Sequence, residues 1–196
     1  MKKIGLQSGV VLATFCLIAA AAQELRKAPE LAYNVPGQGE KLLSQYHGKV
    51  VALEFILTTC PHCQAASRLM TTLQQEYGPR GFQALDLAIN ALDDNRTPQQ
   101  ADALVAAFAN NFQVGFPVGW VPRDRFLSFT GFSITELTVV PQLVLIDRKG
   151  YIHYQTPPRG DEMAMKEATI RQRIEELLAL PASSSGRSSA RVHSAR

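Results

Sequence analysis

Residues 50–63 read VVALEFILTTCPHC. The run Val50–Leu57 is apolar apart from Glu54 and contains several β-branched and aromatic residues, which predicts a strand buried on both faces. A helical pattern begins at Pro61 and carries apolar side chains at helical spacing as far as Tyr77. A Cys-x-x-Cys pair between such a strand and the start of a helix is typical of a redox motif.

The placement of the two cysteines favours disulfide chemistry. Cys60 and Cys63 are separated by two residues on a first helical turn, so their sulfurs can come close enough to bond. At the helix N-terminus, free backbone N–H groups and the positive end of the helix dipole favour a thiolate at Cys60. Pro61 suits the first helical position, and His62 can direct a hydrogen bond or a positive charge toward Cys60. Cys60 is therefore the candidate nucleophile, and Pro61 and His62 are candidates for tuning the redox behaviour of the pair.

Composition indicates one globular domain with terminal extensions. The chain has 196 residues, of which 46% are hydrophobic and 19% charged. The formal charge of +3 comes from the ends, because residues 23–181 hold 15 of the 20 basic residues against all 17 acidic ones. A basic face of the kind that binds nucleic acid is therefore not expected.

The N-terminus is typical of an export signal. A signal peptide is predicted over residues 1–22, with a charged start, an apolar run at Val10–Ala22 and small residues at Ala20–Ala22 for cleavage. The alternative is an uncleaved membrane anchor formed by residues 4–22. Cys16 lies inside this segment and is interpreted as a small apolar residue, which leaves one cysteine pair in an oxidising compartment.

The rest of the chain is predicted to contain a linker at 23–40 with at most a short strand at 31–35, a domain at 41–180, and a disordered Ser/Arg-rich tail at 181–196. The aromatic-rich stretch 123–135 is expected to be irregular or a helical turn. Strands and helices are expected at 50–57, 61–77, 82–90, 97–115, 116–121, 142–147, 151–155 and 161–180. This order predicts an α/β fold with a mixed central sheet flanked by helices.

From about Leu42 to Leu180 the sequence resembles the TlpA/ResA-like family of exported thiol-disulfide oxidoreductases. The resemblance rests on the order and spacing of four stretches: LSQYHGKVV at 43–51, CPHC at 60–63, FPV at 116–118 and VPQLVLIDRKG at 140–150. It implies a thioredoxin-like fold, because the family has that fold.

The same resemblance places Val140 and Pro141 at the family's cis-proline position. In the family this loop lies against the cysteines, and the backbone before the proline pairs with an extended substrate segment. A proline directly before a buried strand also needs a structural reason. The alternative is an ordinary trans proline at the start of a strand.

Glu54 is a candidate for proton transfer. It is the only charge in its strand and lies six positions before Cys60, an arrangement that resembles the buried acid of thioredoxin. Burial would raise the pKa of the carboxyl, so Glu54 could take the proton from Cys63 when Cys63 attacks a mixed disulfide. The alternative places Glu54 at a sheet edge with its carboxyl in solvent. Many relatives also carry an acid soon after the second cysteine, where this chain has Gln64–Ala66.

The expected function is that of an exported, extracytoplasmic or periplasmic thiol-disulfide oxidoreductase, either soluble after cleavage near Ala22 or tethered by residues 4–22. It would exchange a Cys60–Cys63 disulfide with protein thiols or disulfides through a mixed disulfide at Cys60, with a redox partner protein and no cofactor. The direction is open. The dipeptide Pro61-His62 resembles that of the oxidant DsbA, whereas the rest of the chain resembles a family consisting largely of reductants.

Two alternatives keep a role for the cysteines. A zinc site would need a second cysteine pair, and His47 and His153 are isolated in the sequence. A peroxiredoxin-like thiol peroxidase would carry a proline and a Thr or Ser at the positions of Leu53 and Leu57. The motif therefore favours disulfide exchange over both alternatives.

A third alternative is a chaperone or binding module on the same scaffold. Its surface would consist of aromatic side chains in the middle of the chain, namely Trp120, Phe126, Phe129 and Phe132. Aromatic residues more often fill a core, so this alternative depends on their exposure.

Overall fold

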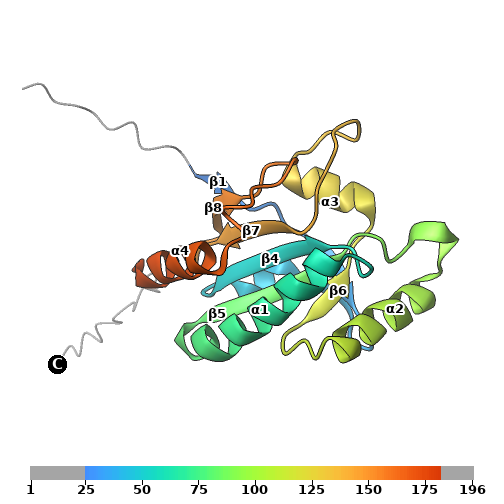
Figure 1. Cartoon of the computed structure of the whole chain (residues 1–196), viewed down its shortest axis with the longest axis horizontal. Coiled ribbons are helices and arrows are strands. Elements are labelled where there is room, and N and C mark those ends of the chain that lie inside the picture. Colours follow the sequence, from blue (N-terminus) through green and yellow to red (C-terminus); the bar gives the residue numbers. More distant parts are fainter. Residues whose placement is uncertain (1–24, 182–196) are drawn as a thin grey trace, which may run out of the picture.

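The structure, a computed structural model, describes residues 25–181 (Figure 1). The predicted signal peptide or anchor at 1–22 lies outside these residues, as does the predicted tail beyond Pro181. Within the described residues no helix is long and apolar enough to cross a membrane.

Eight strands form one mixed sheet in the order β1-β8-β7-β4-β5-β6-β2-β3. The central strands β4, β5 and β6 run parallel, and every other pairing is antiparallel. The mixed central sheet predicted from the sequence is therefore confirmed. The five strands from the predicted domain are β4 (Val50–Ile56), β5 (Phe82–Ala88), β6 (Val118–Trp120), β7 (Gln142–Ile146) and β8 (Tyr151–Gln155).

Helices cover both faces of this sheet (Figure 1). Phe126 and Phe129 of α3 pack on one face, and the other face is covered by α1, α2 and α4 through residues such as Leu73, Val105 and Ile174. The helices are α1 (Pro61–Tyr77), α2 (Pro98–Asn111), α3 (Arg123–Thr130) and α4 (Glu167–Ala179), with short 3₁₀ segments η1 (Leu43–Tyr46), η2 (Gly78–Arg80) and η3 (Asp93–Asn95).

The start of α2 shows how local sequence sets an element. The Thr97 hydroxyl accepts a hydrogen bond from the Gln100 N–H at 3.3 Å, and the Gln100 side chain accepts one from the Thr97 N–H at 2.8 Å. This capping box, followed by Pro98 at the first helical position, satisfies two free donors at the helix end.

The N-terminal segment differs from the prediction. Residues 23–40 were expected to be a linker with at most a short strand at 31–35, but 26–42 contribute three strands to the sheet: β1 (Arg26–Lys27), β2 (Ala32–Val35) and β3 (Gly39–Leu42). The expected short strand corresponds to β2. Gly37 and Gly39 have positive φ angles, which allow the tight turn of the β2–β3 hairpin. Leu31, Tyr33 and Val35 are buried in the core.

Two later segments also differ from the prediction. The stretch expected to be irregular contains α3, because Phe126 and Phe129 pack their rings against Phe55 at centroid distances of 4.8 and 5.7 Å. The last helix begins at Glu167 rather than at residue 161. Met163 is 62% exposed because it lies in the turns that precede this helix.

The N-terminal strands predict a stability effect that a linker would not have. Leu31→Ala removes a buried side chain and should lower the free energy of unfolding by about 2–5 kcal/mol. The matched change Leu42→Ala, at an exposed position of β3, should cost at most about 0.5 kcal/mol. Chemical denaturation of both variants measures the difference, and equal effects would contradict the packing described above.

Candidate active site

The cysteine motif lies at the junction between the end of β4 and the start of α1. The loop between them is fixed by two hydrogen bonds of 3.1 Å: the Thr58 N–H donates to the Asn90 side-chain oxygen, and the Asn90 amide donates to the Thr58 hydroxyl. The Gln64 side chain donates to the Thr58 carbonyl at 3.3 Å. These contacts hold the chain so that Cys60 is the N-cap residue of α1.

The two cysteines have different environments. Both are free thiols; Cys60 is partly exposed, whereas Cys63 is fully buried. The Cys60 sulfur accepts a hydrogen bond from the Cys63 backbone N–H at 3.4 Å, as a capping side chain does. Pro61 occupies the first helical position, as predicted. Cys60 is thus the thiol that a large substrate can reach.

The segment before β7 lies against Cys60. The Val140–Pro141 peptide bond is cis, and the Val140 carbonyl oxygen is 3.9 Å from the Cys60 sulfur. Buried Gln142 ties this segment to the loop after β8, because its side-chain amide donates to the Val139 carbonyl at 2.6 Å and lies 3.2 Å from the Pro157 carbonyl. The structure therefore brings Val140 and Pro141 beside the cysteine pair.

Glu54 lies on the sheet face that α1 covers. Its neighbours Leu53 and Phe55 point to the opposite core cluster, whereas Ala52 and Ile56 share the α1 side. Glu54 is fully buried, so it is not at a sheet edge in solvent. Asp86, its partner in the parallel β4–β5 register, is fully buried beside it.

The two carboxyl groups form few hydrogen bonds. The Ser67 hydroxyl oxygen is 2.5 Å from Asp86 Oδ2 and 3.0 Å from the Cys63 carbonyl. Among the described residues, both Glu54 oxygens and Asp86 Oδ1 have no hydrogen-bond partner. Buried polar atoms without partners are uncommon in folded proteins, and they call for a functional explanation.

Burial raises the pKa of three groups at this site. Desolvation raises the pKa of Glu54 well above its ordinary value, and the neighbouring Asp86 carboxyl raises it further. Desolvation also raises the pKa of Asp86, although the Ser67 hydrogen bond opposes this. The pKa of the Cys63 thiol is raised chiefly by burial, with smaller contributions from Cys60 and Glu54 and an opposing hydrogen bond from the Leu57 backbone.

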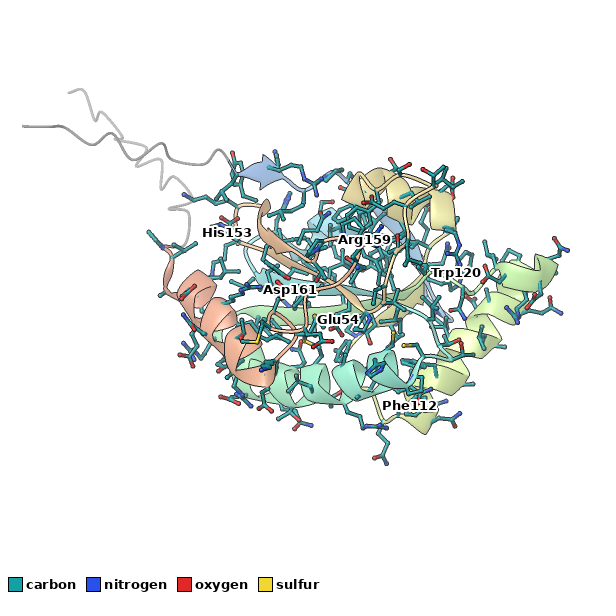
Figure 2. All side chains as sticks on the ribbon, turned by 45° about the horizontal axis from the view of Figure 1, so that its top comes forward. Glu54, Phe112, Trp120, His153, Arg159 and Asp161 are labelled. Carbon is teal, nitrogen blue, oxygen red and sulfur yellow. The ribbon has the colours of Figure 1, made fainter. Side chains whose placement is uncertain are left out.

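A groove of about 580 Å³ runs beside the motif, between α1 and the loop after β8. Its apolar wall includes Leu69 and Val140, and Glu54 lies at its floor. Arg159 and Asp161 line the same groove as Glu54, and all three are labelled in Figure 2. His62 is exposed and lines the groove, and no hydrogen bond joins it to Cys60 among residues 25–181.

Residues 25–155 match a family model described as the AhpC/TSA family. The chain belongs to this family. A curated relative, probable glutathione peroxidase 8-B of Xenopus laevis, is 32% identical over 76 residues. That match covers 39% of this chain and 36% of the relative, so it spans about a third of the relative's length.

Solved structures place this AhpC/TSA family member among thioredoxin-like proteins. A Chlorobium tepidum protein assigned as thiol:disulfide interchange protein DsbE superposes with a TM-score of 0.62 at 25% identity, covering 79% of this chain and 96% of its own. A Bacteroides thetaiotaomicron protein assigned as a protein disulfide isomerase gives 0.60 at 25% identity, covering 78% and 88%. These neighbours confirm the predicted thioredoxin-like fold and the resemblance to thiol-disulfide oxidoreductases.

Three residues of the site were not singled out from the sequence. Asp86 could have been found by the reasoning applied to Glu54, because it is the only charged residue in its strand. Ser67 follows Cys63 by four residues and so shares its helix face. Gln142 carries no such signal, because its contacts are set by the tertiary arrangement of two loops.

The structure also bears on the aromatic residues of the chaperone alternative and on the side chains that could bind zinc. Trp120, Phe126 and Phe129 are buried, and Phe132 packs against the core, so these aromatics form no binding surface. In the part of the chain that the structure describes, no group of three or more His, Cys, Asp or Glu side chains is arranged to hold a metal ion.

The buried carboxyl at position 54 predicts a pH-dependent stability. A carboxyl with a raised pKa in the folded state stays protonated while the unfolded chain ionises, so the free energy of unfolding falls as pH rises between the two pKa values. Glu54→Gln cannot ionise and should exceed the wild type in the free energy of unfolding by on the order of 1–3 kcal/mol at pH 8. The gain should shrink toward pH 4, where the unfolded wild type also holds its proton.

Denaturant unfolding at a series of pH values measures this effect. Glu40→Gln, an exposed change on β3, is the control and should show no such trend. A stability difference between Glu54→Gln and wild type that is constant with pH would contradict a raised pKa.

Proposed function

We propose that the protein is a thiol-disulfide oxidoreductase that exchanges a Cys60–Cys63 disulfide with protein substrates through a mixed disulfide at Cys60. The observation that carries this proposal is the unequal pair of thiols at the start of α1. Cys60 is partly exposed, whereas Cys63 is buried and the Glu54 carboxyl acts electrostatically on its thiol. Family membership and the solved thiol-disulfide neighbours support the same class of reaction.

In the reducing direction, the Cys60 thiolate attacks a substrate disulfide. One new sulfur–sulfur bond forms between Cys60 and the substrate, and the other substrate sulfur leaves as a thiolate. Cys63 then gives its proton to the Glu54 carboxylate and attacks the Cys60 sulfur, which releases the second substrate thiolate. The dithiol loses two electrons and the substrate disulfide gains them.

In the oxidising direction the same steps run in the opposite order. A substrate thiolate attacks the Cys60 sulfur of the enzyme disulfide, and Cys63 leaves and takes a proton from Glu54. A second substrate thiolate then resolves the mixed disulfide and forms the substrate disulfide. The reduction potential of the cysteine pair sets the direction, and equilibration with a glutathione redox buffer measures it. A potential near that of thioredoxin supports a reductase, and one near that of DsbA supports an oxidase.

The surface around Cys60 supports protein rather than small-molecule substrates. The loop that precedes the cis peptide bond exposes three apolar side chains: Ile134 is 84%, Leu137 66% and Val139 45% exposed. This loop continues into the wall of the groove at Val140. Such an apolar rim next to a reactive thiol suits an extended polypeptide with apolar side chains near its cysteine.

We also propose that the protein works outside the cytosol with a separate redox partner protein. The proposed export signal or anchor at 1–22 and the oxidising setting that suits a lone cysteine pair support this location. Localisation of a fusion to a reporter that is active only after export, with and without residues 1–22, tests it.

A thiol peroxidase is the second candidate, and the short match to a probable glutathione peroxidase favours it. Peroxiredoxins resemble one another in carrying a proline and a Thr or Ser before the reactive cysteine, and this chain has Leu53 and Leu57 at those positions. We therefore expect peroxide consumption to be much slower than disulfide exchange. A peroxide assay on the reduced protein makes the comparison.

Substrate trapping tests the mixed disulfide. Cys63→Ser should accumulate disulfide-linked complexes with protein substrates at Cys60, because the resolving thiol is absent. Cys60→Ser and the double variant are the matched controls and should trap none. Non-reducing electrophoresis followed by mass spectrometry identifies the attached proteins, and equal trapping by Cys60→Ser would overturn the assignment of the nucleophile.

The apolar rim predicts a substrate-dependent defect. Leu137→Ser should slow the reduction of insulin disulfides roughly fivefold, which corresponds to the loss of about 1 kcal/mol of apolar contact. Its reaction with the small reagent dithiobis(nitrobenzoate) should be unchanged. Leu42→Ser, a similar change on the distant strand β3, should affect neither reaction, and an equal loss with both reagents would contradict a role in protein binding.

A further inference from the structure

Glu54 and Asp86 are neighbours because of strand register. They pair directly across the parallel strands β4 and β5, about 4.8 Å apart at the backbone, and both point to the face that α1 covers. Both are fully buried, and three of their four carboxyl oxygens have no hydrogen-bond partner among the described residues. Like charges directly opposite one another in a buried sheet are unfavourable, so this pairing is costly unless a proton lies between them.

Within residues 25–181, no positively charged side chain forms an ion pair with either carboxyl group. The titratable groups around it are Cys60 and Cys63 at the start of α1, His62 on the same turn, and Arg159, Asp161 and Glu162 on the loop that closes the groove. Among residues 25–181, none of these forms an ion pair with Glu54 or Asp86. A shared proton is then the remaining way to relieve the repulsion.

Ser67 connects the pair to the cysteine helix. Its hydroxyl is 2.5 Å from Asp86 Oδ2 and lies one helical turn after Cys63, whose carbonyl it also approaches. The hydroxyl favours the ionised form of Asp86 and so lowers the pKa of that carboxyl. Asp86 is thereby held in place by the same helix that carries the buried thiol.

We propose that Asp86 is a positioning residue of the active site: with Glu54 it forms a carboxyl pair that binds one proton, and it sets how strongly Glu54 holds the proton exchanged with Cys63. This inference rests on the proposed function of the two cysteines. In the resolving step the S–H bond of Cys63 breaks, and its proton binds to the ionised pair. The Cys63 electron pair forms the bond to the Cys60 sulfur, and the substrate leaves as a thiolate. In the opposite direction the pair returns the proton to the departing Cys63 sulfur.

The reaction of the reduced protein with dithiobis(nitrobenzoate) separates the two thiols. In a first phase Cys60 displaces one nitrothiobenzoate, and in a second phase Cys63 displaces the other and completes the enzyme disulfide. The second phase should accelerate as pH rises through the titration of the carboxyl pair, before a further rise from direct ionisation of Cys63. Rates of both phases are measured between about pH 5 and pH 9.

Two variants should move this lower inflection in opposite directions. Asp86→Asn removes the like charge, so the inflection should fall by about one pH unit or more. Ser67→Ala removes the hydrogen bond that favours ionised Asp86, so the inflection should rise. In both variants the first phase should keep the wild-type rate and pH profile. Asp124→Asn, the same chemical change at an exposed position of α3, should leave both phases unchanged.

The outcomes distinguish this inference from the proposed function. An unchanged inflection in Asp86→Asn, or shifts of the same sign in both variants, would overturn the role of Asp86 while leaving disulfide exchange intact. A wild-type protein that shows no second phase would overturn the proposed function itself. Should Asp86→Asn fail to fold, as judged by circular dichroism, the sign of the shift in Ser67→Ala decides the question.

Discussion

Parallel pairing of β4 with β5 forces two carboxyl groups onto adjacent positions of a buried sheet face, and the rest of the site is built on that constraint. Two ionised carboxylates at this spacing repel strongly without solvent, so the pair keeps a proton to higher pH than an exposed carboxyl does. Helix α1 packs on the same face and brings Cys63 and Ser67 over the pair. The proton held by the carboxyl pair near the cysteines is therefore a consequence of strand register. Rotation of a side chain cannot change that register.

Such a pair is tolerated because the layers around it are apolar. Toward the start of the two strands, Ala52 and Ala84 pack under α1 and α4; toward their ends, Ile56 and Ala88 pack under α1 and α2. The polar cost is confined to one layer of a core that is otherwise continuous. Burial of the carboxyl pair thus lowers the stability of the fold at one layer of the sheet. The apolar packing on either side of this layer compensates for that loss of stability.

How much the sequence could predict depended on how local each feature is. The strand, the cysteine motif and the helix after it are encoded by neighbouring residues, and so is the burial of Glu54. Asp86 was missed because its role depends on which strand lies beside β4, which periodicity does not reveal. Of the strands within residues 26–42, β2 matches the short strand expected at 31–35, whereas β1 and β3 were missed because the turns of this segment are rich in proline and glycine, which also mark linkers.

The same division between local and non-local contacts separates the two thiols. Cys60 owes its environment to the first turn of α1, where it caps the helix and receives the Cys63 N–H. Cys63 owes its environment to burial and to carboxyls contributed by two strands. Because these sources are independent, substitutions in the core can change the environment of Cys63, the proposed resolving thiol, without changing the exposure of Cys60, the proposed attacking thiol. Under the proposed function, a fold that places one sulfur at a helix cap and the other beside a buried carboxyl pair can therefore change its reduction potential through the core, without changing the surface that contacts the substrate.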